Sequence, residues 1–343
     1  MKPLRHTSRS GLMTLLCCLG ASVVQAAPDY DGIAERLERG DYRGIQGAMV
    51  SVGGERVLEA YSRGNDVNTR HDIRSATKSI TALLVGELVE DGSLRRVRTP
   101  IADLIPDSFA DLPDDDPRRD ITVEDALTMR TGLACDDWAP ASVGHEDKMY
   151  RTDDWAEFLL SQPFAHERGE HFSYCTGGVV LLGRVIETLA GQSVPDFAEE
   201  RLFAPLGIEG ARWDETPKGH TDTGGHLRLR LQDLHAIGML VAQQGRWDGQ
   251  AIVARDWIET ATRAHTNIPN RRERYGYLWW FDQGEVKGQA VSLQFAHGNG
   301  GNFIFIVPEL ELVAAFNGRN YGKPEQFIPM QILTQEIVPA LID

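Results

Sequence analysis

The segment from residue 79 to residue 90 constrains the fold more than any other part of this chain. Only Glu87 and Glu90 are charged in it, and residues 80–89 are almost wholly apolar before Asp91 and Gly92. A helix that is apolar nearly all round offers no face to water and is buried in a core. Covering such a helix on every side needs a large domain, and 343 residues with 42% hydrophobic and 25% charged residues provide one.

Directly before this segment stands Ser75-Ala76-Thr77-Lys78. A helix starting at Ser75 places Ser75 and Lys78 one turn apart on the same face. A serine hydroxyl is a poor nucleophile until a base takes its proton, and a lysine can serve if desolvation or another cation lowers its pKa. The helix N-terminus also favours negative charge near Ser75. The alternative is Ser75 as an N-cap and Lys78 as a solvated charge, which the buried helix disfavours.

The first 26 residues are typical of a secretory signal. A basic front is followed by an apolar run over residues 12–24, and Ala26 ends a stretch of small residues suited to cleavage. The apolar run is short for a membrane anchor, and no later stretch is long and apolar enough to span a bilayer. We therefore expect a signal peptide over residues 1–26 and a periplasmic or secreted protein over residues 27–343.

The charge of the chain limits its partners. The formal net charge is −15, and it becomes −18 when the three basic residues of the signal are removed. A surface this acidic repels nucleic acid and anionic lipid, so we expect neither as a partner. The histidines His220, His226 and His235 lack the spacing of a helical zinc pair, so we expect no metal and no cofactor.

Two cysteines, Cys135 and Cys175, remain after the signal is removed. They are either a disulfide or two separate buried thiols. We favour the disulfide, because an exported protein folds in an oxidising compartment.

The order of the expected elements predicts an α/β (α+β) fold. A helix over residues 30–39 and a hairpin over residues 46–61 come first, and four strands between residues 275 and 317 are joined by short turns, which implies antiparallel pairing. A final helix is expected over residues 325–341. The sheet is thus built from residues 27–94 and 231–343, flanked by helices, with a mostly helical insert over residues 95–230.

Inside that insert, the expected helices include one capped by Thr122, with Asp125 in a capping-box position, running through Met129. Another covers residues 179–189, and a third covers residues 193–203 and ends before Pro205. Clefts between two such regions are common ligand sites, so we expect the site there.

Two further segments are candidates to meet Ser75 and Lys78 in that cleft. In one, Tyr174 stands in a glycine-rich stretch before a helix, and a cationic lysine beside it would lower its pKa and make its phenolate a proton shuttle. In the other, His297 precedes the glycine-rich turn of residues 298–301, whose backbone N–H groups can bind a developing oxyanion together with that of Ser75. The alternatives are a half-buried core tyrosine and an ordinary hairpin turn.

These three segments occur in the order of the three motifs of penicillin-recognising serine hydrolases, and the chain resembles that family over about residues 31–340. It is most similar to the branch of class C β-lactamases, DD-peptidases, related esterases and 6-aminohexanoate-dimer hydrolases. Supporting stretches are residues 127–133, 245–247 and 275–280. The resemblance implies a β-lactamase/transpeptidase-like fold.

The resemblance also implies roles for single residues. Ser75 resembles the acylated nucleophile, Lys78 its base partner and Tyr174 the tyrosine that relays the proton to the leaving group. His297 resembles the basic residue of the third motif, and the N–H groups around Gly298, Asn299 and Gly300 resemble part of the oxyanion hole.

Two departures from the family pattern bear on the substrate. Thr176 stands where the second motif usually has an asparagine that binds a substrate amide, and His297 stands where β-lactamases usually have lysine. A neutral histidine does not grip a β-lactam carboxylate, and His297 is mostly neutral at pH 7 unless its pKa is raised.

The sequence therefore predicts an exported serine hydrolase that cleaves an ester or a small linear amide through an acyl-enzyme on Ser75. The alternatives are a penicillin-binding or sensor-type protein that acylates with little turnover, and a DD-carboxypeptidase or weak β-lactamase.

Overall fold

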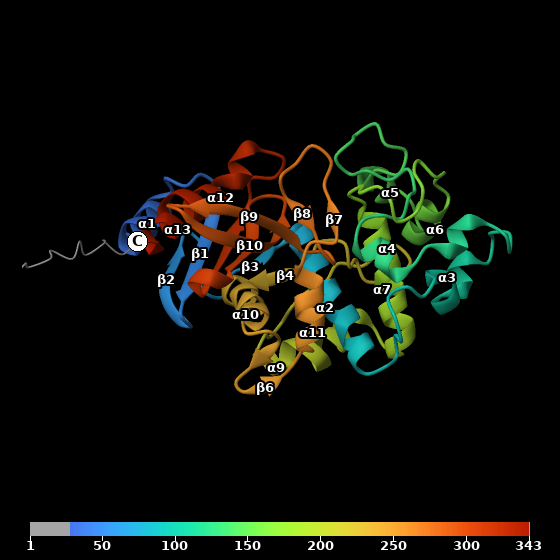
Figure 1. The fold of residues 1–343 in the computed structure, drawn as a ribbon, viewed down its shortest axis with the longest axis horizontal. Coiled ribbons are helices and arrows are strands. Elements are labelled where there is room, and N and C mark those ends of the chain that lie inside the picture. The colour runs from blue at the N-terminus through green and yellow to red at the C-terminus, as the bar shows by residue number, and fades with distance from the viewer. Residues whose placement is uncertain (1–27, 343) are drawn as a thin grey trace, which may run out of the picture.

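The structure, a computed structural model, describes residues 28–342, and the expected signal peptide lies outside the described residues. Within this range the strands of the main sheet come from both ends of the chain (Figure 1). Its order is β2-β1-β12-β11-β10-β9-β8-β7, and the pairs are antiparallel. The strands are β1 (Ile45–Val52), β2 (Glu55–Tyr61), β7 (Thr266–Asn267), β8 (Arg274–Tyr275), β9 (Trp280–Val286), β10 (Gln289–Gly298), β11 (Asn302–Val307) and β12 (Leu312–Gly318).

Two small ribbons lie outside the main sheet. One pairs β3 (Arg70–Asp72) with β4 (Arg228–Arg230), and the other pairs β5 (Arg246–Trp247) with β6 (Gln250–Ala251). The first ribbon matters for the site, because it joins the segment before Ser75 to the segment that ends the helical region.

Helices flank the sheet and fill the region between β3 and β4. The α-helices are α1 (Tyr30–Arg39), α2 (Thr77–Glu90), α3 (Ile101–Leu104), α4 (Val123–Leu127), α5 (Glu146–Met149), α6 (Trp155–Leu160), α7 (Thr176–Ala190), α8 (Val194–Ala198), α9 (Ala204–Leu206), α10 (Leu231–Ala242), α11 (Arg255–Thr262), α12 (Ile328–Gln331) and α13 (Val338–Leu341). Shorter 3₁₀ helices cover Arg74–Ala76, Pro106–Phe109, Pro117–Asp120, Pro308–Leu310 and Pro324–Phe327, and π-helical turns cover Glu199–Phe203 and Ile332–Ile337.

The two faces of the sheet are covered by different helices (Figure 1). On one face, α10 packs so closely that a Cβ on Gly238 would lie 2.7 Å from the side chain of Ile304. On the other, α1 and the C-terminal helices lie together, and Arg36 forms an ion pair with Glu336. This arrangement confirms the expected antiparallel sheet flanked by helices, whereas the exact domain boundaries stay a prediction.

The buried helix expected from the sequence is α2, at the junction of the sheet and the helical region (Figure 1). Every residue from Thr77 to Leu88 is buried, including Lys78 and Glu87. The helix contacts α7 on one side and α11 on the other, and the side chain of Trp257 from α11 lies against Gly86. The central position of α2 was therefore predictable from its lack of a polar face.

Several expected elements differ from the structure at their ends. The helix capped by Thr122 has its capping box with Asp125, but it ends at Leu127 because Met129 adopts a left-handed backbone with φ 58°. The helix expected over residues 179–189 begins three residues earlier, at Thr176. The helix expected to end before Pro205 continues to Leu206, because α8 is followed directly by the π-helical turn Glu199–Phe203 and by α9.

The first of the four expected strands, over residues 275–281, is wrong in its middle. Residues 276–279 form a tight turn between β8 and β9, in which Gly276 donates its N–H to the carbonyl of Trp279 and Leu278 has φ 58°. A Cβ on Gly276 would lie 2.2 Å from the carbonyl oxygen of Ala261, so only glycine fits there. The expected C-terminal helix is helical throughout, as the 3₁₀ turn Pro324–Phe327 followed by α12, a π-helical turn and α13, with a proline in the first turn of each α-helix.

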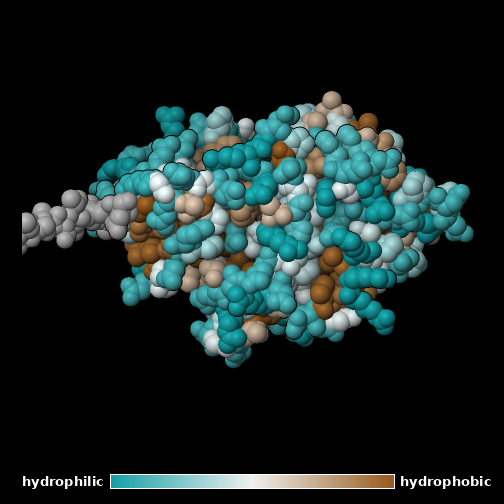
Figure 2. Space-filling view, in the orientation of Figure 1, coloured by the Kyte–Doolittle hydropathy of each residue, from teal (hydrophilic) through white to brown (hydrophobic). Residues whose placement is uncertain are grey.

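The surface is mostly hydrophilic on the face shown in Figure 2, as the strongly acidic composition leads one to expect. No helix within residues 28–342 is long and apolar enough to cross a membrane.

Candidate active site

A cavity of about 310 Å³ opens between the sheet and the helical region, where the three motif segments meet. Each of the three segments contributes to its wall. The cavity is lined by Ser75, Asp137, Trp138, Glu146, Tyr174, Arg271, Trp280, His297, Asn299, Gln326 and Phe327.

Ser75 lies in the 3₁₀ helix Arg74–Ala76 and not in the first turn of an α-helix, which starts only at Thr77. The cause is Arg74, whose backbone is left-handed with φ 52°. The side chain of Asp72 accepts a hydrogen bond of 2.9 Å from the N–H of Arg74 and so supports this turn. The expected spacing of Ser75 and Lys78 is kept, because a 3₁₀ turn brings residues three apart onto one face.

Lys78 contacts Ser75 directly. Its Nζ donates a hydrogen bond of 3.1 Å to the Oγ of Ser75 and one of 2.5 Å to the carbonyl oxygen of Gly224. The side chain is only 1% exposed. Burial lowers the pKa of Lys78, but interactions with Tyr174 and with the carboxylates of Glu146, Asp137 and Asp222 outweigh it, so the pKa is raised. The condition under which Lys78 could serve as the base, a lowered pKa, is therefore not met, and Lys78 is an ammonium at neutral pH.

Tyr174 lies beside Lys78, whose Nζ is 5.2 Å from the centre of the phenol ring. Burial raises the pKa of Tyr174, and this effect outweighs both the charge of Lys78 and a hydrogen bond with Ser75, which lower it. The expected fall of this pKa was wrong, because a fully desolvated phenolate loses more than one nearby cation restores. The ring stacks on Trp138 at 5.1 Å.

Thr176 is fully buried and does not line the cavity. Its Oγ1 donates a hydrogen bond of 2.8 Å to Glu146, and its N–H donates one of 2.6 Å to Asp137. Both carboxylates line the cavity, and both act on Lys78. Burial and the neighbouring Glu146 together raise the pKa of Asp137 to about 6, against the opposing effect of Lys78. Sequence reasoning missed this acidic pair.

His297 reaches the cavity from the end of β10, and its ring stacks on Phe303 at 4.4 Å. Burial lowers the pKa of His297 to about 4, so the imidazole is neutral, as expected. Its Nε2 is buried and has no hydrogen-bond partner among the described residues.

The glycine-rich turn after His297 brings β10 against the nucleophile segment. A Cβ on Gly298 would lie 1.9 Å from the carbonyl oxygen of Ile73, so only glycine allows this approach. Asn299 lines the cavity, and its side-chain oxygen accepts a hydrogen bond from the N–H of Gly322. Gly300 has φ 100° and accepts a hydrogen bond from Asn320 through its carbonyl.

Cys135 and Cys175 are joined by a disulfide, as we favoured from the sequence. The bond ties the loop that carries Asp137 and Trp138 to the segment that carries Tyr174 and Thr176. Asp137 and Trp138 were not predicted; their position within three residues of the first cysteine is the one sequence signal that could have placed them near the site.

The mouth of the cavity is aromatic. Trp138 and Phe327 are 45% and 40% exposed, which is unusual for such large apolar side chains. The guanidinium of Arg271 lies over the rings of Trp138 and Trp280 at 5.4 and 5.5 Å. Arg271 and Phe327 belong to segments without a motif, so no pattern in the sequence indicated that they line the site.

The histidines weighed as metal ligands lie apart. His220 is paired with Glu187 and His226 with Asp222, while His235 is buried elsewhere. Within residues 28–342, no group of three or more histidine, cysteine or acidic side chains is arranged to hold a metal ion.

Comparisons with known proteins agree with this geometry. The sequence model of the beta-lactamase family matches residues 31–333. Penicillin-binding protein 4 of Amycolatopsis lactamdurans is 35% identical over 134 residues, which are 39% of this chain and 33% of that protein. The 6-aminohexanoate-dimer hydrolase of Paenarthrobacter ureafaciens is 24% identical over 269 residues, which are 71% of this chain and 66% of that protein.

Among solved structures, the octameric penicillin-binding protein homologue from Pyrococcus abyssi superposes with a TM-score of 0.66 at 21% identity, covering 90% of this chain and 78% of that one. The chain matches only about a third of the length of the Amycolatopsis protein. The resemblance drawn from the three motifs is confirmed at the level of the family and the fold. Because the family match extends over nearly all of the described residues, the chain belongs to the beta-lactamase family of serine hydrolases.

Proposed function

We propose that this protein is an exported serine hydrolase that cleaves an ester or a small linear amide through an acyl-enzyme on Ser75. One observation carries the proposal: the Oγ of Ser75 lies 3.1 Å from the Nζ of Lys78 in the wall of a cavity that Tyr174 also lines. A hydroxyl, an ammonium and a phenol thus meet where a carbonyl group can enter.

In the proposed reaction, Ser75 attacks the carbonyl carbon and its proton passes to the leaving group through Tyr174. Both raised pKa values mean that Lys78 is charged and Tyr174 is neutral at pH 7. The ammonium of Lys78 then stabilises negative charge as it develops on the Ser75 Oγ, and the fraction of Tyr174 that has lost its proton acts as the base. Water later releases the acyl group from Ser75.

The oxyanion of the tetrahedral intermediate would be bound by backbone N–H groups of Ser75 and of the turn over residues 298–301. The close packing of Gly298 against Ile73 supports this, because it brings the two backbone segments together. We propose that neutral His297 orients the substrate and does not bind a carboxylate.

Two features beside the cavity, the engaged Thr176 and the exposed rings at its mouth, favour an ester with an apolar part over a peptide-like amide. The hydroxyl of Thr176 is engaged with Glu146 and lies behind the cavity wall, so it is not free to bind a substrate amide. The exposed rings of Trp138 and Phe327 offer apolar surface to an acyl or leaving group. A short-chain p-nitrophenyl ester therefore suits the cavity as a first substrate.

The test is covalent labelling followed by intact mass. A fluorophosphonate should add one equivalent to the wild-type protein and none to Ser75→Ala. Ser79→Ala is the matched control, because Ser79 lies one turn further along α2 with its hydroxyl bonded to the carbonyl of Leu278. Undiminished labelling of the Ser75 variant would remove Ser75 as the nucleophile.

A sensor-type or penicillin-binding function is the second candidate, and the engaged Thr176 favours it. If the engaged Thr176 makes hydrolysis of the acyl-enzyme slow, a β-lactam gives a stable one-to-one adduct, and p-nitrophenyl butyrate gives a single burst of product. Continued turnover of the ester excludes this function. A panel that adds a D-Ala-D-Ala peptide and a linear amide separates DD-carboxypeptidase and amidase activity from esterase activity.

Export is proposed from the signal-like residues 1–26, and the disulfide between Cys135 and Cys175 supports it. The N-terminal sequence of the protein recovered from a periplasmic extract should begin near residue 27. Recovery of the uncleaved chain from the cytoplasm alone would contradict it.

A further inference from the structure

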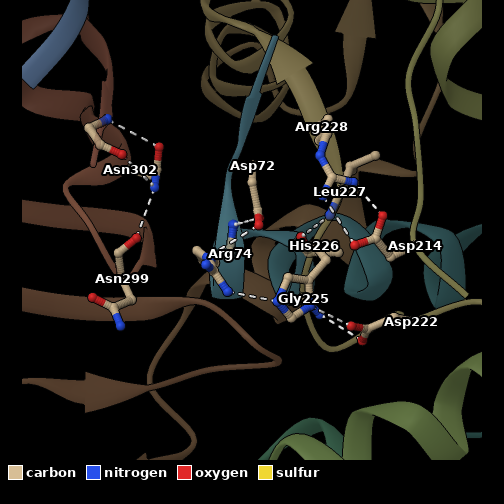
Figure 3. Close-up of polar contacts among 12 residues, drawn as sticks. Asp72, Arg74, Asp214, Asp222, Gly225, His226, Leu227, Arg228, Asn299 and Asn302 are labelled. Atoms are coloured by element: carbon tan, nitrogen blue, oxygen red, sulfur yellow. Dashed lines mark hydrogen bonds and ion pairs between the residues drawn. The ribbon is translucent and has the colours of Figure 1, made fainter. Parts of the chain in front are cut away.

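Two residues with left-handed backbones, Arg74 and His226, face each other in the polar cluster of Figure 3. Arg74 has φ 52° and directly precedes Ser75, while His226 has φ 58° and follows Gly225. Residues other than glycine adopt this conformation at a cost in free energy, and it persists where the surroundings hold it. The two side chains are in contact, with Nη1 of Arg74 2.7 Å from Nε2 of His226.

The other ring nitrogen of His226 faces Asp222. The Nδ1 atom lies 2.7 Å from one carboxylate oxygen of Asp222, whose side chain is fully buried. The second oxygen accepts hydrogen bonds of 3.0 Å from the N–H groups of Gly224 and Gly225. The carbonyl of Gly224 in turn accepts the 2.5 Å hydrogen bond from Lys78.

A continuous series of hydrogen bonds therefore connects Arg74, the residue before Ser75, to the backbone of Gly224, whose carbonyl oxygen accepts a hydrogen bond from Lys78. It starts at Arg74, passes through His226 and Asp222, and ends at the carbonyl of Gly224. It also joins two segments that are far apart in sequence, the turn after β3 and the loop before β4 (Figure 3).

The geometry assigns one tautomer to His226. A guanidinium only donates hydrogen bonds, so the Nε2 that faces Arg74 accepts. The proton is therefore on Nδ1, where it is donated to Asp222. A doubly protonated ring would place two donors 2.7 Å apart and would lose the contact with Arg74.

We propose that His226 is a positioning residue, whose neutral imidazole couples Arg74 to Asp222 and thereby fixes Ser75 and Lys78 relative to each other. The inference rests on the proposed hydrolase function, because the atoms it fixes are the nucleophile and its partner. Small displacements of such groups slow a reaction without weakening substrate binding.

Variants that keep one half of the contact test the coupling. His226→Asn keeps a donor at the place of Nδ1 for Asp222, and His226→Gln keeps an acceptor near the place of Nε2 for Arg74. If both contacts are needed, each variant lowers kcat about 10- to 100-fold, as far as His226→Ala does, with KM within about threefold of wild type. Full activity of the Asn variant or of the Gln variant overturns the coupling.

A second approach comes from the other end of the chain of contacts. Arg74→Met removes the donor to His226 and should lower kcat by a similar factor, so the proposal stays testable if a His226 variant fails to fold. The matched control is Asp214→Asn. Asp214 lies in the same cluster, paired with Arg228, and its loss should leave kcat within about twofold of wild type.

The pH profile gives a readout that a purely structural role would not move. His226 is faced by Asp222 on its own loop, by Arg74 and Asp72 from the β3 segment, by Asp214, and by the edge of the Tyr150 ring. The hydrogen bond to Asp222 raises the pKa of His226, whereas Arg74 lowers it. The net effect raises the pKa of His226 above its ordinary value, so the wild-type kcat should rise in a step, as the ring becomes neutral, at a pH above that of an ordinary histidine.

The Asn and Gln variants should lack this step, while Asp137→Asn should keep it. The Asp137 variant is needed because Asp137 itself titrates near pH 6. A step that survives in both His226 variants overturns the proposal. Fluorophosphonate labelling distinguishes failure of the proposed hydrolase function from failure of the positioning role. If Ser75→Ala loses the label while every His226 and Arg74 variant keeps a normal kcat, only the positioning role is refuted.

Discussion

Lys78 donates a hydrogen bond of 3.1 Å to Ser75 although its ammonium is removed from water almost completely. The charge is retained because three carboxylates and the phenol of Tyr174 raise its pKa against the effect of burial. Such an ammonium is suited to stabilising an alkoxide more than to taking a proton, and this sets the pH behaviour of the site.

Replacing Lys78 by methionine should abolish most activity. The methionine fits the volume, but it removes the donor to Ser75 and leaves the charges of Asp137, Glu146 and Asp222 without their cation. We expect kcat/KM for p-nitrophenyl butyrate to fall about 10³-fold or more, and the melting temperature to fall as well. Lys78→Arg keeps the positive charge but does not fit the space of the lysine, so we expect it to lose most activity as well. More than a tenth of the wild-type activity in either variant would contradict the role of Lys78 in stabilising charge on Ser75.

Activity should rise with pH between 7 and 10. The pKa values of Lys78 and Tyr174 are both raised above 10.5 and 10.0, so the basic form of either group increases about tenfold with each pH unit in this range. The logarithm of kcat/KM for a p-nitroanilide, which is stable in alkali, should therefore climb with a slope near one. A plateau reached below pH 8 would assign the base to another group, such as Asp137.

Glu87 should limit stability at neutral and alkaline pH. Burial raises its pKa from 4.5 to about 7, and Oε1 has no partner among the described residues. Because the carboxyl pKa is higher in the folded protein, folding is favoured when Glu87 is protonated. The contribution of Glu87 to the free energy of unfolding is therefore complete below pH 4.5 and is lost as the pH rises through 7. Glu87→Gln should be more stable than wild type at pH 8, by at most about 3 kcal/mol, and nearly equal to it at pH 4.5. Urea unfolding at both pH values measures the difference, and an equal effect at both would refute the titration.

The disulfide should support both stability and the site. It closes a loop of 40 residues, and the chain-entropy estimate for such a loop is about 4 kcal/mol. We expect Cys135→Ser with Cys175→Ser to lower the melting temperature and to lower kcat, because the bond ties the loop of Asp137 to the segment of Tyr174. A reducing agent should reproduce both effects in wild type and neither in the double variant. Activity that survives in a variant of reduced stability would confine the bond to a structural role.

Trp138 should govern binding of aromatic leaving groups. Its exposed ring stacks on Tyr174, and the guanidinium of Arg271 makes a cation–π contact with it at the mouth of the cavity. Trp138→Ala should raise KM for p-nitrophenyl esters about tenfold and leave KM for methyl esters nearly unchanged, whereas Trp138→Phe keeps most of the stacking. An equal change for both ester types would show that the ring supports Tyr174 and does not contact substrate.

Short-range patterns predicted much of the fold. The helix Tyr30–Arg39, the hairpin of β1 and β2, and the capping box of Thr122 and Asp125 all depend on neighbours within a few residues. The burial of α2 followed from its lack of a polar face. The strand expected across Gly276 failed, because the turn there is set by contact with the distant Ala261.

The directions of the two key pKa values could not be predicted from the motifs. The pKa of Tyr174 depends first on its burial under segments that are distant in sequence. The pKa of Lys78 depends on burial and on charged groups from other segments: Asp137 from the loop after Cys135, Glu146 from the start of α5, and Asp222 from the loop before β4. The Ser-x-x-Lys motif is identical whether the lysine folds into apolar or acidic surroundings, so the motif does not predict the direction in which the lysine pKa shifts.

By itself, the sequence determined the buried helix, the three segments that carry Ser75, Tyr174 and His297, and the family to which they belong. Those features are encoded by composition and spacing along the chain. Only the tertiary structure decided the charge of Lys78, the acidic pair around Thr176 and the contact between Arg74 and His226. Electrostatic interactions and hydrogen bonds depend on distance in space, and the fold alone brings these groups together.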